Sequence, residues 1–170
     1  MQTIHGVALS IYGCGIIICG SSGIGKSELA LELVSHGHQF IADDVVNVSR
    51  ADAENHVTII NPDKQFFINI RGLGFIDIQQ IFNKQNSIKN SSKLDMIIQL
   101  SNMDLLTIDP LEQLRDTTEI LGTQISRYTL IKGVSRPLAV LVEVLVKQYL
   151  EQNSTSFDSH EAFIEMHRKH

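Results

Sequence analysis

The stretch GIIICGSSGIGKSELALEL, residues 15–33, combines a short apolar run, a glycine-rich loop and an amphipathic segment. The apolar run over 16–19 predicts a buried strand, and the apolar spacing over 28–35 predicts a helix that ends at Gly37. The residues between them match the P-loop pattern GxxxxGK[ST] in full. This order of strand, loop and helix predicts an α/β fold whose phosphate-binding loop is Gly20-Ser21-Ser22-Gly23-Ile24-Gly25-Lys26-Ser27.

Each residue type in this loop suits the binding of a phosphate. Glycines let the backbone N–H groups turn inward, and the N-terminus of the following helix favours an anion. Lys26 can reach the outer phosphates of a nucleotide, and the hydroxyl of Ser27 can take a place on Mg²⁺. A glycine-rich turn without a ligand is the alternative, and the strand before the loop and the helix after it argue against that alternative.

The composition favours a small nucleotide over a nucleic acid as the ligand. The chain has 170 residues, of which 43% are hydrophobic and 19% charged, as expected for one globular domain over residues 1–170. Its 14 basic and 19 acidic residues give a net charge of -5 and no basic stripe for a nucleic-acid backbone. The apolar runs are too short to span a bilayer and no basic leader precedes them, so we expect a cytoplasmic protein without membrane contacts.

The rest of the chain alternates short strands with turns and ends in helices. Two cysteines, Cys14 and Cys19, are interpreted as buried apolar thiols. Asp77 and Gln80 form an N-cap pair that opens a short helix, and the polar tract 83–93 is interpreted as a mobile surface loop. Pro137 fits the first turn of a late helix. The predicted strands cover 3–12, 16–19, 39–42, 45–48, 57–60, 66–70 and 96–100, and the predicted helices cover 77–82, 138–149 and 159–168.

Two aspartates follow the predicted strand 39–42 near the same sheet edge as the loop. Asp43 and Asp44 lie inside an apolar stretch, where carboxylates are costly unless they are used. Successive strand residues face opposite ways, so we expect only one of the two to point at the phosphate. Arg71 follows a predicted strand and precedes two flexible glycines. It belongs either to a loop that closes on a phosphorylated partner or to an ordinary turn with a solvated arginine. His5 is a lone histidine, and by itself it is interpreted as structural.

Taken together, the segments IHGVALSIYGCGIIICGSSGIGKSELALELVSHGHQFIADDVV and FINIRGLGFID resemble the catalytic domain of the HPr kinase/phosphorylase family. The order of parts is the same: a His-Gly-Val strand, the P-loop, a Gly-His pair, Ala-Asp-Asp and Ile-Arg-Gly-Leu-Gly. The resemblance spans about residues 4 to 150. It implies the P-loop kinase fold shared with phosphoenolpyruvate carboxykinase, with a central mixed sheet and flanking helices, usually assembled as a hexamer.

The resemblance implies a kinase that uses ATP and Mg²⁺ to phosphorylate a serine of HPr, the phosphocarrier of the sugar phosphotransferase system. Family members often also run the reverse step, in which inorganic phosphate attacks the phosphoserine and pyrophosphate is formed. His5 and Lys26 fall on family catalytic positions, and Ser27 falls on the magnesium-binding serine. Asp44 falls on the residue that exchanges the serine proton, and residues 68–77, including Arg71, fall on a segment used in both reactions.

The chain departs from the family pattern at several places. Asn69 stands where the family has a magnesium-binding glutamate, so the amide offers an oxygen without a charge. A segment tied to dephosphorylation keeps Arg136 but loses its neighbours, and Arg115 is a plausible counterpart of another family arginine. The chain starts almost at His5, without the separate N-terminal domain of many family members, so we expect either a naturally short form or a trimmed piece of a longer protein.

Two other functions explain part of these features. Asn69 and the altered segment 131–137 are consistent with a nucleotide-binding regulator that has lost catalysis. A small-molecule P-loop kinase would also place an aspartate after its second strand, but it leaves the segment around Arg71 unexplained.

Overall fold

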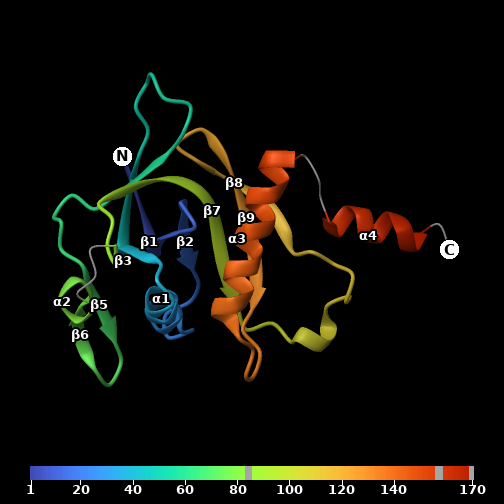
Figure 1. Ribbon diagram of the computed structural model, residues 1–170, viewed down its shortest axis with the longest axis horizontal. Coiled ribbons are helices and arrows are strands. Elements are labelled where there is room, and N and C mark those ends of the chain that lie inside the picture. Colours follow the sequence, from blue (N-terminus) through green and yellow to red (C-terminus); the bar gives the residue numbers. More distant parts are fainter. Residues whose placement is uncertain (83–85, 156–158, 169–170) are drawn as a thin grey trace.

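The structure, a computed structural model, describes residues 1–82, 86–155 and 159–168. The chain forms a central sheet, a small two-stranded hairpin and four α-helices within these ranges (Figure 1). The elements are β1 (Gln2–Ile11), β2 (Cys14–Cys19), α1 (Lys26–Ser35), β3 (Gln39–Ser49), β4 (Thr58–Ile60), β5 (Phe67–Ile70), β6 (Gly74–Asp77), α2 (Ile78–Phe82), β7 (Ser91–Ser101), a 3₁₀ turn (Leu105–Thr107), β8 (Arg115–Ile120), β9 (Thr123–Ile131), α3 (Leu138–Thr155) and α4 (Ser159–Arg168).

The central sheet is mixed, with strand order β2-β1-β3-β4-β7-β9-β8 and an additional pairing between β2 and β7. The pairings therefore close a circuit through β2, β1, β3, β4 and β7. β7 runs parallel to both β2 and β9, whereas β1 is antiparallel to β2 and β3. Because β2, β7 and β9 are parallel, their carboxyl ends meet at one edge of the sheet, where ligands of α/β proteins bind.

Two apolar clusters lie on the two sides of the sheet. The first lies between the sheet and the helices, and it includes Leu9, Ile18, Leu33 and Val142. The second contains strand residues such as Ala8 and includes no helical residue. In Figure 1, α1 and α3 lie over the same face of the sheet, whereas α4 projects away from it. The expected α/β architecture, with a mixed sheet and flanking helices, is confirmed.

The predicted strands 3–12 and 16–19, the P-loop helix and the final helices are present, and several boundaries differ. The predicted strands 39–42 and 45–48 are one continuous strand, β3, because its ladder with β1 runs through both aspartates. The surface-loop prediction for 83–93 is wrong beyond residue 85: Ser87 and Ser92 are buried, and β7 begins at Ser91. Residues 83–85 lie outside the described residues. Helix α3 continues through Thr155, beyond the predicted end at residue 149.

Other local predictions are confirmed. The backbone N–H of Gln80 donates to the Asp77 carboxylate at 3.2 Å, as expected for the N-cap pair of α2. Cys14 is a buried free thiol, as expected, whereas Cys19 is free but only half-buried. Burial, followed by the nearby charge of Asp95, raises the pKa of Cys14 to about 11, so this thiol stays protonated and unreactive near neutral pH.

Candidate functional site

The glycine-rich loop connects the carboxyl end of β2 to the start of α1, as the sequence predicts. Its first glycine packs tightly: a β-carbon built on Gly20 would lie 3.2 Å from the carbonyl oxygen of Leu100, near the end of β7. Gly25, with a φ of 108°, occupies the N-cap position of α1 without a side-chain cap. The first N–H groups of this helix are therefore available to an anion.

Lys26 lies across the loop that it ends. Its ammonium donates to the carbonyl oxygens of Gly20 at 2.8 Å and Ser21 at 3.1 Å. Both acceptors are uncharged, so the positive charge of Lys26 has no carboxylate partner among the salt bridges of the described residues. A phosphate bound in the loop would supply the missing negative charge.

One carboxylate of strand β3 reaches the end of the loop. The hydroxyl of Ser27 donates to Oδ1 of Asp43 at 3.3 Å, and the backbone N–H of Asn69 donates to Oδ2 of the same residue at 3.0 Å. Asp43 thus connects helix α1 to strand β5. The neighbouring Asp44 is exposed and has a φ of 70°, which is unusual for a residue other than glycine.

A bulge in the β1–β3 ladder decides which aspartate faces the helix. Ala8 pairs with Ala42, but Leu9 pairs with Phe40, so Ile41 is an extra residue on β3. Phe40 packs in the cluster beneath the helices, whereas Ile41 and Ala42 both pack in or against the cluster on the other side. The extra residue shifts the alternation by one position, and Asp43 rather than the next residue therefore projects toward α1.

The surroundings of Asp43 shift the pKa of its carboxyl upward. Burial raises the pKa of the Asp43 carboxyl above its ordinary value, although hydrogen bonds from Asn69 and Ser27 oppose the shift. The adjacent charge of Asp44 raises the pKa slightly further. A half-buried carboxylate with a raised pKa, beside a phosphate-binding loop, has the properties of a group that exchanges protons.

A further predicted residue, His5, lies on the strand next to this carboxylate. His5 is exposed on β1, where it pairs with Val45, two residues beyond Asp43 on the neighbouring strand. His5 shares a face of β1 with Val7, which packs beneath the helices and is paired with Asp43. Diagonal neighbours of this kind lie about 7–8 Å apart between Cα atoms. His5 is thus one strand away from the group that contacts Ser27.

The predicted residues Asn69 and Arg71 lie on the hairpin formed by β5 and β6. Asn69 contacts Asp43 through its backbone N–H. Asn69 itself is exposed, because Ile68 and Ile70 take the buried positions of β5. Arg71 is exposed in the turn before β6. The hairpin also exposes Leu73 in this turn and Phe75 on β6, whose accessible fractions are 70% and 78%.

The two remaining predicted arginines, Arg115 and Arg136, each contact a neighbouring residue. The guanidinium of Arg115 lies 5.3 Å from the centre of the Tyr128 ring, on strands β8 and β9. Arg136 donates from Nη1 to the carbonyl oxygen of Ile131 at 2.8 Å, which closes the turn between β9 and α3. Arg136 therefore orders the segment 131–136.

Sequence reasoning did not identify Lys132 as part of this site. A β-carbon built on Gly25 would lie 3.5 Å from the Lys132 ammonium, which places the second lysine against the phosphate loop. The missing signal was the strand β9 that precedes it, which the sequence analysis did not predict. Recognising residues 123–131 as a parallel strand would have placed Lys132 at the ligand-binding edge of the sheet.

The residues at the loop suit a magnesium ion that is shared with a nucleotide. The Ser27 hydroxyl and the Asp43 carboxylate are hard oxygen donors, and Mg²⁺ commonly takes one or two such protein ligands together with phosphates and water. The part of the chain that the structure describes contains no group of three acidic, histidine or cysteine residues that could hold a metal by itself. This donor set therefore fits a nucleotide-bound magnesium better than a permanent metal centre.

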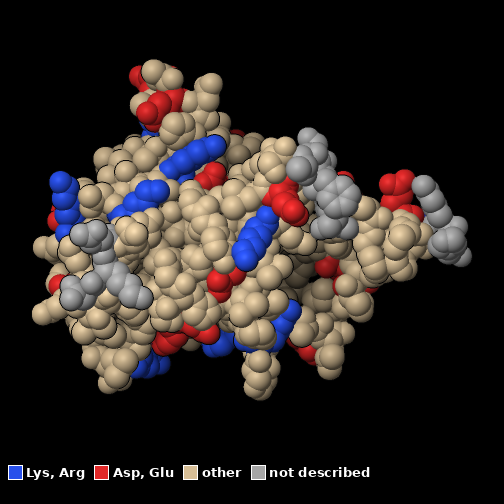
Figure 2. Space-filling view, in the orientation of Figure 1, with Lys and Arg blue, Asp and Glu red and all other residues tan. Residues whose placement is uncertain are grey.

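Among the described residues, the face of the molecule in Figure 2 has no basic stripe, as the sequence predicts. Figure 2 shows lysine and arginine side chains dispersed among acidic ones on the face in view. In the described ranges, no helix has the length and apolarity needed to cross a membrane.

Comparisons with known proteins identify the family. Residues 1–167 match the model described as "HPr Serine kinase C-terminal domain". The chain is 40% identical over 167 residues to the HPr kinase/phosphorylase of Neisseria meningitidis, covering 96% of this chain and 52% of the relative. It is 39% identical over 150 residues to the protein of the same name in Burkholderia cenocepacia, covering 88% of this chain and 46% of the relative.

A solved structure shows the same fold. The structure titled "Structure of the Hpr(Ser) kinase/phosphatase from Coxiella burnetii" matches with a TM-score of 0.81 and 30% sequence identity, covering 91% of this chain and 99% of that chain. The chain spans about half the length of the curated relatives that it matches. The P-loop, the Asp43 contact and these three comparisons lead to one assignment: the chain belongs to the HPr serine kinase C-terminal domain family.

Proposed function

We propose that the protein is an ATP- and Mg²⁺-dependent kinase that phosphorylates a serine of the phosphocarrier HPr. The observation that carries this proposal is the contact between Ser27 of the phosphate loop and the carboxylate of Asp43. A carboxylate at this position would act as a proton acceptor beside the terminal phosphate of a nucleotide bound in the loop, which supports the proposal. The relatives' shared name, HPr kinase/phosphorylase, supports HPr as the substrate.

The proposed reaction needs a base for the serine proton and positive charge at the transferring phosphoryl group. The serine oxygen of HPr attacks the γ-phosphorus of ATP, the bond to the β–γ bridging oxygen breaks, and ADP leaves. Asp43 accepts the serine proton, because serine is a weak nucleophile unless an oriented base removes that proton. Lys26 stabilises the negative charge on the transferring phosphoryl group. Mg²⁺, when bound with ATP, would neutralise phosphate charge beside Ser27 and Asp43.

The resemblance in sequence assigns the proton exchange to Asp44 instead. Asp44 is one residue away, exposed, and held with positive φ by the same strand. Because the carboxylate at Ser27 belongs to Asp43, we propose Asp43 as the base and Asp44 as the competing candidate. The two assignments predict opposite results for the two single variants.

Exposed apolar residues favour a protein substrate over a small metabolite. Leu73 and Phe75 flank the turn after Arg71, and Phe67 is also 46% exposed on the same hairpin. β5 of this hairpin touches Asp43 through Asn69, so a protein bound there would lie near the phosphate loop. A contiguous apolar surface on a soluble domain commonly marks an interaction site.

The reverse reaction and the assembly are further parts of the proposal. Phosphorolysis would use inorganic phosphate as the nucleophile, with Asp43 returning a proton to the serine oxygen and pyrophosphate as the product. We also propose a homo-oligomer, a hexamer by resemblance to the family, because α4 projects from the sheet (Figure 1) and exposes Phe163 and Met166.

Intact-mass analysis of HPr tests the function directly. HPr incubated with the protein and Mg-ATP should gain one phosphoryl group, and subsequent addition of inorganic phosphate should remove it if the reverse reaction operates. An Asp43→Asn variant that binds ATP but leaves HPr unmodified would support the proposed base. Wild-type protein that binds ATP without modifying HPr would point to a nucleotide-binding regulator, and turnover of a small hydroxylated metabolite alone would point to a small-molecule kinase.

A further inference from the structure

A second lysine approaches the phosphate loop from the turn that follows β9. A β-carbon built on Gly25 would lie 3.5 Å from Nζ and 3.9 Å from Cε of Lys132. The backbone N–H of Lys132 donates to the carbonyl oxygen of Ser101 at 2.8 Å, which holds the residue beside the end of β7. Both the backbone and the side chain of Lys132 thus lie at the edge where β2, β7 and β9 end.

The ammonium of Lys132 lacks a counter-charge in the described structure. The salt bridges within residues 1–82, 86–155 and 159–168 do not include this lysine. Lys132 is partly buried, and a partly buried cation is stabilised by an anion that it can contact. The loop against which it lies is built to bind anionic phosphate.

The turn that carries Lys132 is held by Arg136. Nη1 of Arg136 donates to the carbonyl oxygen of Ile131 at 2.8 Å, one residue before the lysine. Gly133 adopts a φ of 53°, and a β-carbon there would lie 2.8 Å from Cδ of Arg136, so the arginine stem packs directly on the turn. Lys132 is therefore presented by an ordered segment, which reduces the entropy lost when it binds a ligand.

The two lysines differ in their present contacts. Lys26 donates to carbonyl oxygens of the loop itself, whereas the ammonium of Lys132 lies beside Gly25, the N-cap residue of α1. The first turn is where the free N–H groups of a P-loop helix meet the phosphates. A phosphate in the loop would consequently have a cation on the side of Lys132 as well as the charge of Lys26.

We propose that Lys132 is a second phosphate-binding lysine that contacts the outer phosphoryl oxygens of a nucleoside triphosphate in the loop. This inference rests on the proposed nucleotide-dependent function. With the two lysines at the loop, positive charge from the protein supplies part of the neutralisation that Mg²⁺ otherwise provides. The contribution of Lys132 to nucleotide affinity is therefore largest when the divalent ion is removed.

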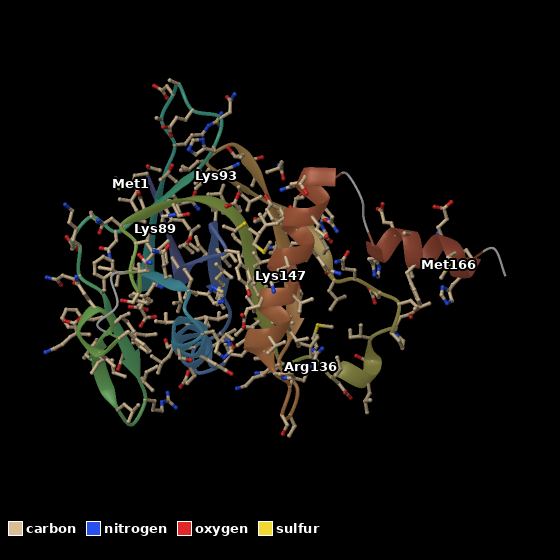
Figure 3. All side chains as sticks on the ribbon, in the orientation of Figure 1. Met1, Lys89, Lys93, Arg136, Lys147 and Met166 are labelled. Atoms are coloured by element: carbon tan, nitrogen blue, oxygen red, sulfur yellow. The ribbon has the colours of Figure 1, made fainter. Side chains whose placement is uncertain are left out.

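Nucleotide affinity in two buffers tests this role. Dissociation constants for ATP, ADP and AMP are measured by calorimetry with Mg²⁺ and with EDTA, for the wild type, Lys132→Met and Lys132→Arg. Methionine keeps an unbranched apolar stem, so it removes the charge with little loss of packing. Lys93→Met is the control, because Lys93 lies at the opposite end of β7 and far from Arg136 in Figure 3.

We expect Lys132→Met to weaken ATP binding about tenfold in EDTA, since a hydrogen bond to a charged group contributes enough to change affinity by this factor. The loss should be smaller with Mg²⁺ and smaller for AMP, and arginine should restore most of the affinity. Equal ATP affinity of the wild type and Lys132→Met in EDTA, with unchanged melting temperatures, overturns the inference. Absence of ATP binding by both the wild type and the Lys93 control contradicts the proposed function itself.

Discussion

The Ser27 hydroxyl and the Asp43 carboxylate lie 3.3 Å apart, which joins the end of the phosphate loop to the middle of strand β3. Replacing Asp43 with asparagine keeps the size of the side chain and removes the proton acceptor. We expect Asp43→Asn to lower the rate of HPr phosphorylation by about 100-fold or more, the usual contribution of a general base. The rate is measured by intact mass at saturating ATP.

Asp44→Asn is the matched control for this experiment. Asp44 is exposed, so its replacement should change the rate much less than replacement of Asp43. The reverse outcome, an active Asp43→Asn and an inactive Asp44→Asn, would move the proton exchange to the residue that the family resemblance indicates.

The raised pKa of Asp43 predicts a cost in stability. Burial raises the pKa of Asp43 above its value in the unfolded chain, so folding is favoured by this group at pH values below the ordinary value of 3.8 and disfavoured once the pH rises through the folded pKa. Asp43→Asn should therefore raise the melting temperature at pH 7, by about 2 °C or more.

The gain in melting temperature of Asp43→Asn over the wild type should shrink as the pH falls and the Asp43 carboxyl of the wild type becomes protonated. Thermal unfolding of the wild type and Asp43→Asn is followed from pH 7 down to pH 3, where the two melting temperatures should converge. A variant that is less stable than the wild type at pH 7 would show that the hydrogen bonds to Ser27 and Asn69 outweigh the burial of the charge.

The exposed Phe75 provides a test of the substrate class. Phe75 is 78% exposed on β6, so Phe75→Ser should leave folding intact. If HPr docks on this hairpin, the KM for HPr should rise by about tenfold, as expected when an apolar anchor of an interface is removed, and the affinity for ATP should stay the same. Val134→Ser, at an apolar position that is even more exposed and lies in the turn before α3, is the comparison.

The contact between Arg136 and the Ile131 carbonyl predicts an indirect effect on nucleotide binding. Arg136→Met removes the bond that closes the turn, and ATP affinity should fall by about threefold to tenfold because Lys132 loses its fixed position. In a Lys132→Met background, the same change should have little further effect on affinity. Full additivity of the two losses would mean that Arg136 binds the nucleotide itself.

Glu143 links helix α3 to the turn after α1 and predicts acid sensitivity. Its carboxylate lies 2.7 Å from Nδ1 of His36 and 3.2 Å from Nε2 of His38, and it accepts a hydrogen bond from the Tyr12 hydroxyl at 3.1 Å. Burial acts to raise the pKa of Glu143, but these hydrogen bonds together outweigh burial and lower the pKa below its ordinary value of 4.5.

A lowered pKa gives this contact a definite pH dependence. Its stabilisation is complete above the unfolded value of 4.5 and is lost as the pH falls through the folded pKa. Glu143→Gln should therefore lower the melting temperature at pH 6 by about 2–4 °C and make little difference at pH 3. Equal melting curves of the two proteins at pH 6 would show that the cluster contributes no net stability.

The local sequence pattern determined the phosphate loop and the helices. The P-loop, α1 and α3 are each specified by residues close together in the chain. Their glycines and apolar spacing therefore predict these elements without knowledge of tertiary contacts. The segment Ala42-Asp43-Asp44 likewise showed that only one carboxylate could face the loop. The family resemblance added the prediction that the segment around Arg71, now seen as the β5–β6 hairpin, belongs to the site.

Only the tertiary structure decided which aspartate meets the loop and which second cation lies beside it. The bulge at Ile41 arises where β3 pairs with β1, more than 30 residues earlier in the chain, and it moves the helix-facing position to Asp43. Lys132 reaches Gly25 because β9 pairs in parallel with β7, which pairs in parallel with β2. Strand pairing brings together residues that no local pattern connects, and a shift of one residue exchanges the two faces of a strand.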